Sequence, residues 1–241
     1  MTNGWVDIKN ADVVLIMGSN AAENHPCGFK WAIEAKKTRN AKLVSVDPRF
    51  TRTSAVSDVY APIRPGTDIA FLNGIIRHAL ATGRFHEDYV KLHTSGPYII
   101  SEKFGFHGGL FSGFNDSKGE YDKSQWAYEP DPKTNGYMVD PEMKHPRCVF
   151  QLLKKHVERY TPEMVERICG TPKEEFLRVA DVVTSTGTAQ RCGTIMYALG
   201  WTQHSTGVQM IRAAATLQLV LGNVGRPGGG EIGRASCRER V

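Results

Sequence analysis

Two short polar segments, each directly after an apolar run, contain the residue types needed to contact a nucleotide. Gly18 and Asn20 follow the run DVVLIM, and Asp47 and Arg49 follow KLVSV. Backbone N–H groups between a strand and a helix can hold a phosphate. An acid at the end of the next strand can accept hydrogen bonds from ribose hydroxyls or a guanine edge, and an arginine can pair with phosphate. We therefore expect a nucleotide at the carboxyl edge of a parallel sheet.

Two later segments are expected at the same sheet edge. Gly66 and Asp68 lie in a turn between a predicted strand and a helix, and Gly200 and Gln203 follow a strand predicted at 194–199. Taken singly, the first pair is equally consistent with a helix cap, and the glycine turn after DVVLIM with an ordinary strand–helix connection. Their shared placement makes these positions candidate walls of one cofactor pocket.

No residue set in the sequence predicts catalysis or metal binding. The chain has neither GxGxxG nor GxxxxGK, so the dinucleotide fingerprint and the P-loop are both missing. No Ser-His-Asp set, HExxH motif or carboxylate pair stands out, and His204 is expected to be structural. The five cysteines are far apart and none form CxxC, which disfavours a metal or iron–sulfur site. The residues thus predict that the chain holds a cofactor, and they assign no catalytic residue and no metal ligand.

The elements that position the first segments follow an α/β pattern. Buried strands are predicted at 12–17 and 42–46, with a helix that begins at Pro26 between them. Residues 56–63 give a third strand, which Pro62 marks as an edge strand or a strand end.

A helix predicted at 69–81 follows, with Thr67 or Asp68 as its cap and Gly83 at its carboxyl end. Strands and helices that alternate at these short intervals are typical of an α/β fold with a parallel sheet. We therefore predict Rossmann-like, dinucleotide-binding units.

The middle of the chain has a different texture, with glycine, proline and short polar residues between single aromatics. We expect an irregular segment that can contain a hairpin and that is packed by its aromatic side chains. Three helices follow, at 147–160, after Thr161, and after Thr171, where a capping box with Glu174 is predicted. The sheet pattern then returns as a strand at 194–199, a loop at 200–204, a helix at 205–221 and a glycine-rich exit at 222–230.

These patterns divide the chain into five parts. They are an αβ dinucleotide-binding part at 1–94, an irregular insertion at 95–145, a helical segment at 146–190, a second αβ cofactor-binding edge at 191–230 and a tail at 231–241.

Composition limits the classes of function. The 241 residues are 41% hydrophobic, enough for one large domain or two small ones. The net charge of +5 is spread without a run of five or more like charges, which disfavours nucleic-acid binding. No apolar run approaches the roughly 18 residues of a membrane span, and the first residues lack the pattern of a signal peptide.

Several segments resemble the large (alpha) catalytic subunit of molybdopterin-dependent formate dehydrogenases. The resemblance is strongest to the respiratory, formate dehydrogenase-N type. The most specific of these segments are VDPRFTRT, APIRPGTDIAFL and YALGWTQH. The resemblance covers about residues 1–230. It implies that the chain is an internal piece of a longer enzyme, inactive by itself, with Met1 as an internal methionine.

The resemblance also implies a cofactor, a reaction and partners. In this family two molybdopterin guanine dinucleotides hold molybdenum or tungsten, and formate is oxidised to carbon dioxide. Electrons leave through iron–sulfur clusters, among them a four-iron four-sulfur cluster whose ligands are not in this chain. Iron–sulfur and membrane cytochrome subunits are the expected partners, with a periplasmic, membrane-associated complex or, alternatively, a cytoplasmic one. The implied dinucleotide contacts are Gly18, Asn20, Asp47, Arg49, Gly66, Asp68, Gly200 and Gln203.

The sequence departs from the family pattern at its carboxyl end. After Gly230 the residues EIGRASCRERV look unrelated to the family, so we expect a frameshift, a cloning scar or an assembly join at 231–241. The metal ligand of the family lies outside the chain by the same comparison. Two alternatives therefore stay open: another molybdopterin oxidoreductase of the nitrate, arsenate or thiosulfate class, or a non-catalytic nucleotide-binding module.

Overall fold

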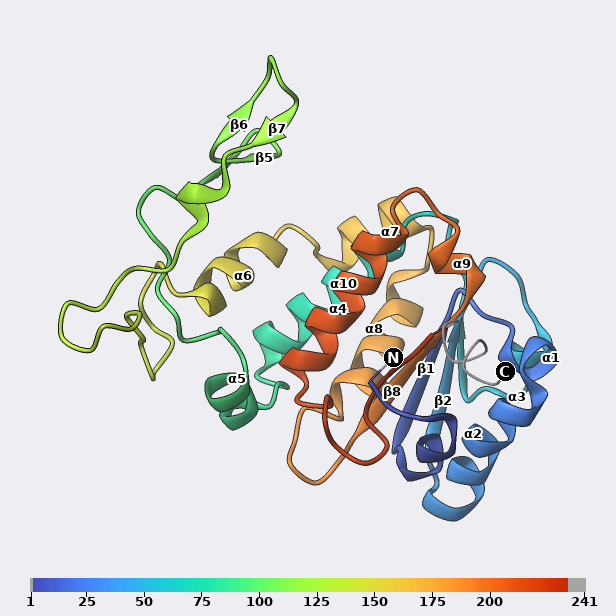
Figure 1. The fold of residues 1–241 in the computed structure, drawn as a ribbon. Helices are drawn as coiled ribbons and strands as arrows, with labels where there is room; N and C mark the ends of the chain where they lie inside the picture. Colours follow the sequence, from blue (N-terminus) through green and yellow to red (C-terminus); the bar gives the residue numbers. More distant parts are fainter. Residues whose placement is uncertain (1, 234–241) are drawn as a thin grey trace, which may run out of the picture. The chain divides into compact units, whose positions relative to one another are not determined.

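The computed structural model describes residues 2–233, and these form two compact units. The larger unit combines residues 2–87 with residues 157–233, and the smaller unit is Asp88–His156. Figure 1 shows the path of the chain through both. Among the described residues, no helix is long and apolar enough to cross a membrane.

A five-stranded parallel sheet forms the centre of the larger unit (Figure 1). Its strand order is β3-β2-β1-β8-β9. The bounds are Val13–Met17 for β1, Lys42–Val46 for β2, Val59–Ala61 for β3, Gly193–Tyr197 for β8 and Gly230–Ile232 for β9. All five residues of β1 are buried, as expected for a strand of a parallel sheet covered on both faces. The predicted α/β fold is therefore confirmed.

The first two predicted strands are confirmed, and the third is shorter than expected. Val56, the first residue of the predicted strand, instead ends a short helix, α3 (Arg52–Val56). The cause is local, since Thr51 accepts a hydrogen bond from the backbone N–H of Ser54, whose hydroxyl receives one from the backbone N–H of Thr51. β3 lies at the edge of the sheet, as Pro62 indicated.

Helices cover both faces of the sheet (Figure 1). The amino-terminal half contributes the 3-10 helix η1 (Trp5–Asn10), α1 (Ala21–Asn24), α2 (Pro26–Arg39) and α4 (Asp68–Thr82). Pro26 begins α2 and Gly83, in the left-handed conformation, ends α4, both as predicted. The predicted side-chain cap of α4 is wrong, because Thr67 Oγ1 donates to the carbonyl of Arg64 instead, and Asp68 is engaged elsewhere.

The carboxyl-terminal half adds α7 (Pro162–Cys169), α8 (Lys173–Thr184), α9 (Leu199–Thr202) and α10 (Gly207–Val220). The predicted capping box of α8 is wrong. Thr171 lies before the helix and its hydroxyl donates to the carbonyl of Pro62 at 2.5 Å, while Pro172 occupies the cap position. Residues 200–204 are likewise not a simple loop, since most of them belong to α9 and the turn that closes it.

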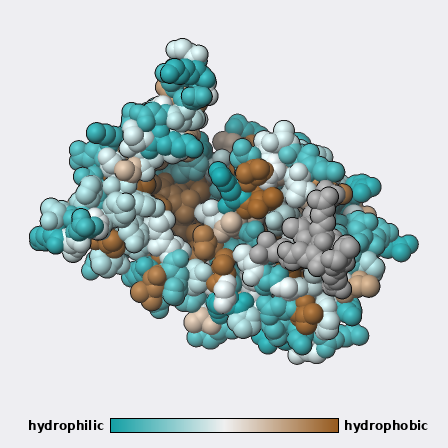
Figure 2. All heavy atoms as spheres, in the orientation of Figure 1, coloured by the Kyte–Doolittle hydropathy of each residue, from teal (hydrophilic) through white to brown (hydrophobic). Residues whose placement is uncertain are grey.

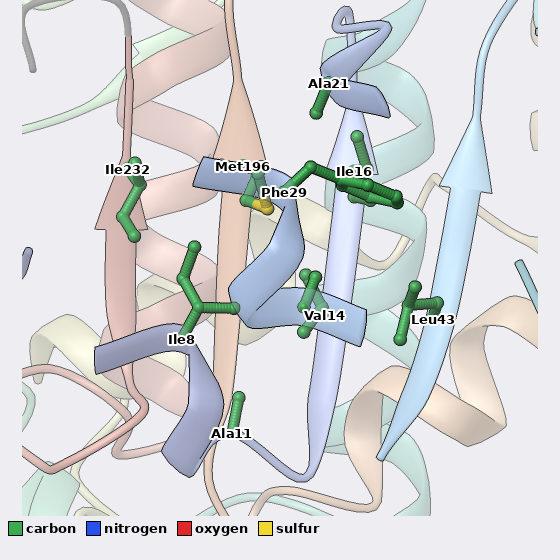
Figure 3. Packing of buried hydrophobic residues seen from close by; sticks show 10 residues of the cluster. Ile8, Ala11, Val14, Ile16, Ala21, Phe29, Leu43, Met196 and Ile232 are labelled. Carbon is green, nitrogen blue, oxygen red and sulfur yellow. The ribbon is translucent and has the colours of Figure 1, made fainter. Parts of the chain in front are cut away.

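One part of the core lies between the sheet and the η1–α2 pair (Figure 3). Val14 and Ile16 of β1 point to this side, where Phe29 of α2 and Ile8 of η1 meet them. On the other face, α4 buries the six apolar side chains that the helical pattern predicted: Phe71, Leu72, Ile75, Ile76, Ala79 and Leu80. The sheet is therefore packed on both faces, and the loops of interest follow the carboxyl ends of its strands.

The smaller unit has little regular structure. It begins within α5 (Glu87–His93), one residue after the helix starts, and ends one residue before the end of α6 (Val149–Val157). Two short hairpins lie between them, β4–β5 (Phe106–His107, Leu110–Phe111) and β6–β7 (Phe114–Asn115, Glu120–Tyr121), followed by the 3-10 helix η2 (Lys123–Trp126). Aromatic rings pack against one another there, with Phe111 next to Trp126 at 5.6 Å between centroids. The predicted aromatic packing of this segment is confirmed.

The carboxyl-terminal residues of the described chain enter the sheet. Glu231 and Ile232, the first two residues of the predicted tail, belong to β9, which pairs with β8. Gly233 is also described, and residues 234–241, the rest of that predicted tail, lie outside the described residues.

Figure 2 shows polar residues over most of the visible surface, with hydrophobic residues in scattered brown patches. Large apolar side chains that are exposed include Phe50, Leu92 and Val208. Isolated exposed apolar side chains are ordinary on protein surfaces, and none of them defines a site by itself.

Candidate cofactor site at the carboxyl edge of the sheet

The strand order reverses between β1 and β8, and this fixes where a ligand would bind. From β1 the sheet continues through β2 to β3, and from β8 it continues to β9 in the opposite direction. In open α/β sheets, ligands bind outside the carboxyl ends of the strands at such a switch point. Gly18 follows β1 and Gly200 follows β8, so two of the predicted site residues stand at this point.

The backbones of Gly18 and Gly200 are in direct contact. The N–H of Gly200 donates to the carbonyl of Gly18 at 3.0 Å. A Cβ atom on Gly200 would lie 2.6 Å from the Cα and O atoms of Gly18. Gly18 has a φ of +59°, and a Cβ there would lie 2.8 Å from Cδ1 of Trp201. Only glycine fits at both positions, so the two loops meet through bare backbone.

The turn after Gly18 offers backbone amides. The backbone N–H groups of Ser19, Asn20 and Ala21 donate no hydrogen bond to any group of the described chain. Ala21 lies beyond the carboxyl end of β1 (Figure 3). The Asn20 side chain, in contrast, is used within the protein: its amide donates to Glu23 and its Oδ1 accepts from Thr53 Oγ1 at 2.9 Å. Asn20 can thus present its backbone amide while its side chain is held by neighbours.

Asp47 and Arg49 form a turn directly after β2. The N–H of Arg49 donates to Asp47 Oδ1 at 2.9 Å, and the hydroxyl of Tyr60 donates to the carbonyl of Asp47 at 3.1 Å. Asp47 is half-buried and Arg49 is exposed. Burial raises the pKa of Tyr60, and the charge of Asp47 raises it further. The tyrosine therefore stays a neutral donor. This turn fixes the Asp47 carboxylate near the sheet edge and leaves the guanidinium accessible.

Asp68 is more deeply buried than the sequence suggested. It is 6% exposed, and its Oδ1 accepts a hydrogen bond from Nε1 of the fully buried Trp201 at 2.8 Å. Burial raises the pKa of Asp68, while the Trp201 hydrogen bond and the charge of His204 oppose that rise. The charge of Asp47 adds to the rise in the pKa of Asp68.

Gly66 and Gln203 are both exposed at this edge. Gly66 has a φ of +83°, and the nearest atom to a Cβ built there is Cδ2 of His204 at 3.9 Å. The backbone N–H of Gln203 donates to the carbonyl of Leu199 and closes α9. The turn around Gly66 and the end of α9 are therefore neighbours, and open space remains at Gly66.

The loop that carries Gly66 and Asp68 is anchored by residues that the sequence did not single out. Arg64 NH1 donates to the carbonyls of Arg167 and Ile168 at 2.8 and 3.2 Å, at the carboxyl end of α7. The Cys169 thiol donates to the carbonyl of Thr67 at 3.5 Å. Burial raises the pKa of this thiol to about 11, so it remains protonated and acts as a donor.

Sequence reasoning missed Trp201, Thr53 and Arg64 as parts of this edge. Trp201 stands between Gly200 and Gln203, and a large aromatic residue within a glycine-rich turn is a signal that could have found it. The partners of Thr53 and Arg64 are 33 and about 100 residues away in sequence, so no local pattern indicates them. In the part of the chain that the structure describes, no group of three or more His, Cys, Asp or Glu side chains could hold a metal ion.

Comparison with known proteins gives a consistent result. The chain is 55% identical over 231 residues to the major subunit of the nitrate-inducible formate dehydrogenase of Escherichia coli (strain K12). The aligned region covers 95% of this chain and 23% of that protein. It is 53% identical over 230 residues to the alpha subunit of a formate dehydrogenase from Megalodesulfovibrio gigas, with 95% and 22% covered. The chain thus spans less than a quarter of the length of these relatives, and the predicted resemblance is confirmed.

A solved structure shares the fold. Acetylene hydratase from Pelobacter acetylenicus aligns with a TM-score of 0.59 at 18% identity, over 91% of this chain and 24% of that one. The model of the family described as molybdopterin oxidoreductase matches residues 1–236. This chain belongs to the molybdopterin oxidoreductase family.

Proposed function

We propose that this chain is part of the cofactor-binding region of a formate dehydrogenase major subunit. The family implies a molybdopterin cofactor. We propose the finer assignment that the cofactor is a pair of molybdopterin guanine dinucleotides with molybdenum or tungsten, and that this chain holds nucleotide. The single observation that carries the proposal is the backbone contact of Gly18 with Gly200 at the switch point, in a chain 55% identical to such a subunit.

The residues of this edge fit the phosphates and guanosine of such a cofactor. A Cβ atom at Gly18 would collide with Trp201, and one at Gly200 would collide with the Gly18 backbone, so glycine at both positions lets the two loops meet at the switch point. Three amides in the following turn have no hydrogen-bond partner within the described chain, and the Arg49 guanidinium is exposed in the turn after the neighbouring strand β2. Phosphate oxygens match both kinds of donor.

Each predicted site residue then has a proposed task. The backbone at Gly18 and Asn20 holds a phosphate, Asp47 accepts hydrogen bonds from ribose or guanine, and Arg49 pairs with a phosphate. A second wall is formed by the turn at Gly66 and Asp68, and a third by Gly200 and Gln203. All of these tasks bind and orient the cofactor, and none transfers a proton or an electron.

The reaction we propose for the whole enzyme is the oxidation of formate to carbon dioxide. When bound, the molybdopterin metal centre supplies the two-electron chemistry for that conversion. This chain contributes a rigid wall, because its loops follow strands buried on both faces of the sheet. By the resemblance, the metal ligands lie outside the chain, so we expect the isolated chain to oxidise no formate.

Partners and location follow the same proposal. The relatives are named as subunits, which supports a multi-subunit enzyme. We propose iron–sulfur subunits as electron acceptors and a membrane cytochrome subunit beyond them, in a periplasmic, membrane-associated complex.

The proposal is tested by replacing Asp47 with alanine in the enzyme that contains this chain. Guanine released by acid hydrolysis and the bound metal are counted per subunit. We expect a clear loss of both in Asp47→Ala, because a direct nucleotide contact is removed. Asp116→Ala, at an exposed position of the smaller unit, is the matched control and should keep wild-type content. Full cofactor content in Asp47→Ala would show that the assignment of this carboxylate is wrong.

A further inference from the structure

We propose that Trp201 is a positioning residue that locks the two loops of the switch point together, and that Asp68 acts on the cofactor through Trp201. This inference deepens the proposed function and rests on it. It changes the role given to Asp68, from a wall that contacts nucleotide directly to the buried anchor of an indole.

The bond between the two side chains crosses the site. Trp201 Nε1 donates to Asp68 Oδ1 at 2.8 Å, and the two residues are 133 positions apart in sequence. Trp201 is fully buried and Asp68 is 6% exposed. A hydrogen bond from a neutral donor to a buried carboxylate is stronger than one between neutral groups, and it is costly to break where water is excluded. It therefore ties the beginning of α4 to α9.

The ring of Trp201 also fixes the glycine junction. Its Cδ1 atom lies 2.8 Å from the Cβ position of Gly18, so the indole packs directly against that residue. The ring is also stacked on Tyr197, the last residue of β8, with 5.0 Å between centroids and 23° between planes. The indole is thus enclosed between the carboxyl ends of β1 and β8.

The anchor itself cannot move freely. The loop before Asp68 is held by two further hydrogen bonds. The Arg64 side chain donates to the carbonyl of Arg167 in α7, and the Thr171 hydroxyl donates to the carbonyl of Pro62. Because Asp68 begins a helix whose preceding loop is fixed in this way, its carboxylate can set the position of the indole. The backbone hydrogen bond from Gly200 to Gly18 then keeps a constant geometry at the proposed phosphate-binding turn.

The first experiment measures hydrogen exchange of the backbone amides in residues 198–204, in enzyme prepared without cofactor. Trp201→Phe removes the indole N–H and keeps a ring, and Asp68→Leu removes the acceptor. We expect each to raise exchange in this segment about tenfold, since one buried hydrogen bond is lost. Asp68→Asn keeps an acceptor oxygen and should restore exchange to near the wild-type rate. The double variant Trp201→Phe/Asp68→Leu should exchange no faster than either single variant.

Two results would overturn the lock. One is unchanged exchange at 198–204 in Trp201→Phe. The other is an equal rise in the strands β1 and β8, because general destabilisation would then explain the change. Trp31→Phe is the matched control, since the Trp31 ring contacts the ammonium groups of Lys9 and Lys30 and packs against the core cluster of η1 and α2. It should leave exchange at 198–204 unchanged.

The second experiment measures guanine per subunit in the loaded enzyme. We expect less guanine in Trp201→Phe than in Trp31→Phe, and more guanine in Asp68→Asn than in Asp68→Leu. Equal content in the first two variants would show that the lock does not position the cofactor. If wild-type enzyme itself releases no guanine, the proposed cofactor is wrong, while the exchange result still decides whether Trp201 locks the loops.

Discussion

The hydroxyl of Thr53 holds the turn that contains Asn20. It donates to Asn20 Oδ1 at 2.9 Å and accepts from the backbone N–H of Ala22 at 3.0 Å. Thr53 is fully buried in α3, a helix that follows the Asp47 turn. The segment VDPRFTRT therefore does more than present an acid and an arginine, because it also shapes the turn after the neighbouring strand.

This relationship predicts the effect of Thr53→Val. The substitution keeps the shape of the side chain and leaves the Ala22 N–H and the Asn20 oxygen without their partner. We expect the free energy of unfolding to fall by about 1–3 kcal/mol, the usual cost of buried groups that lose a hydrogen bond. Urea denaturation followed by circular dichroism measures it. Thr53→Ser keeps the hydroxyl and should lose less, and an equal loss in both variants would show that the methyl group contributes as much as the two hydrogen bonds.

Arg64 is predicted to stabilise the fold as a cap of α7. Arg64→Ala removes the hydrogen bonds to the carbonyls of Arg167 and Ile168, so we expect a loss of about 0.5–1.5 kcal/mol in the free energy of unfolding. The comparison is Arg52→Ala, which breaks only an ion pair with Glu23 whose arginine side chain is 81% exposed. Such pairs contribute at most about 1 kcal/mol and often nothing. Equal losses from the two alanine variants would contradict the capping role.

The glycine junction predicts a difference between two Gly→Ala variants. Gly18 and Gly83 have similar φ angles, +59° and +70°, but nothing lies within 4 Å of a Cβ at Gly83. Gly83→Ala should therefore cost only the left-handed strain, about 1 kcal/mol. Gly18→Ala adds a collision with Trp201, and we expect a further loss of about 1–3 kcal/mol. Thermal and urea unfolding of both variants measure the difference, and its absence would show that Trp201 can move aside.

The general layout of this fold was predictable because its signals are local. The strands at β1 and β2 are short apolar runs, and α4 shows a helical stripe of six buried side chains that ends at a glycine. The helices α1, α3 and α9 have only four or five residues, too few for a helical period to appear. The sequence pattern accordingly predicted none of them as helices and assigned single residues of two of them, Val56 and Leu199, to the neighbouring strands.

The candidate site was predictable at the level of segments and not of side-chain partners. Strand ends in a parallel sheet must meet at one edge, which is why Gly18 and Gly200 could be assigned to the same place. Whether a threonine hydroxyl caps its own helix or reaches another loop depends on the tertiary fold. Thr171 bonds to Pro62, and Asp68 to Trp201, because packing brings together segments more than 100 residues apart.

The last prediction concerns pH and the histidine between α1 and α2. His25 stacks on Trp5 with 5.4 Å between centroids, and its Nδ1 is buried without a partner among the described residues. Burial lowers the pKa of His25 below its ordinary 6.5, so the folded protein binds fewer protons than the unfolded chain between the two values. Since stability rises with pH wherever the unfolded state binds more protons, His25 should destabilise the fold as the pH falls below about 6.5.

His25→Phe isolates this contribution, because it keeps an aromatic ring against Trp5 and removes the titrating group. The free energy of unfolding of both proteins is measured by urea denaturation from pH 7.5 down to about pH 5. We expect the difference in stability between the His25→Phe variant and the wild type to grow in favour of the variant as the pH falls, and to be constant above about pH 7. A difference that stays constant through the whole range would mean that the His25 ring is protonated equally easily in the folded and unfolded states.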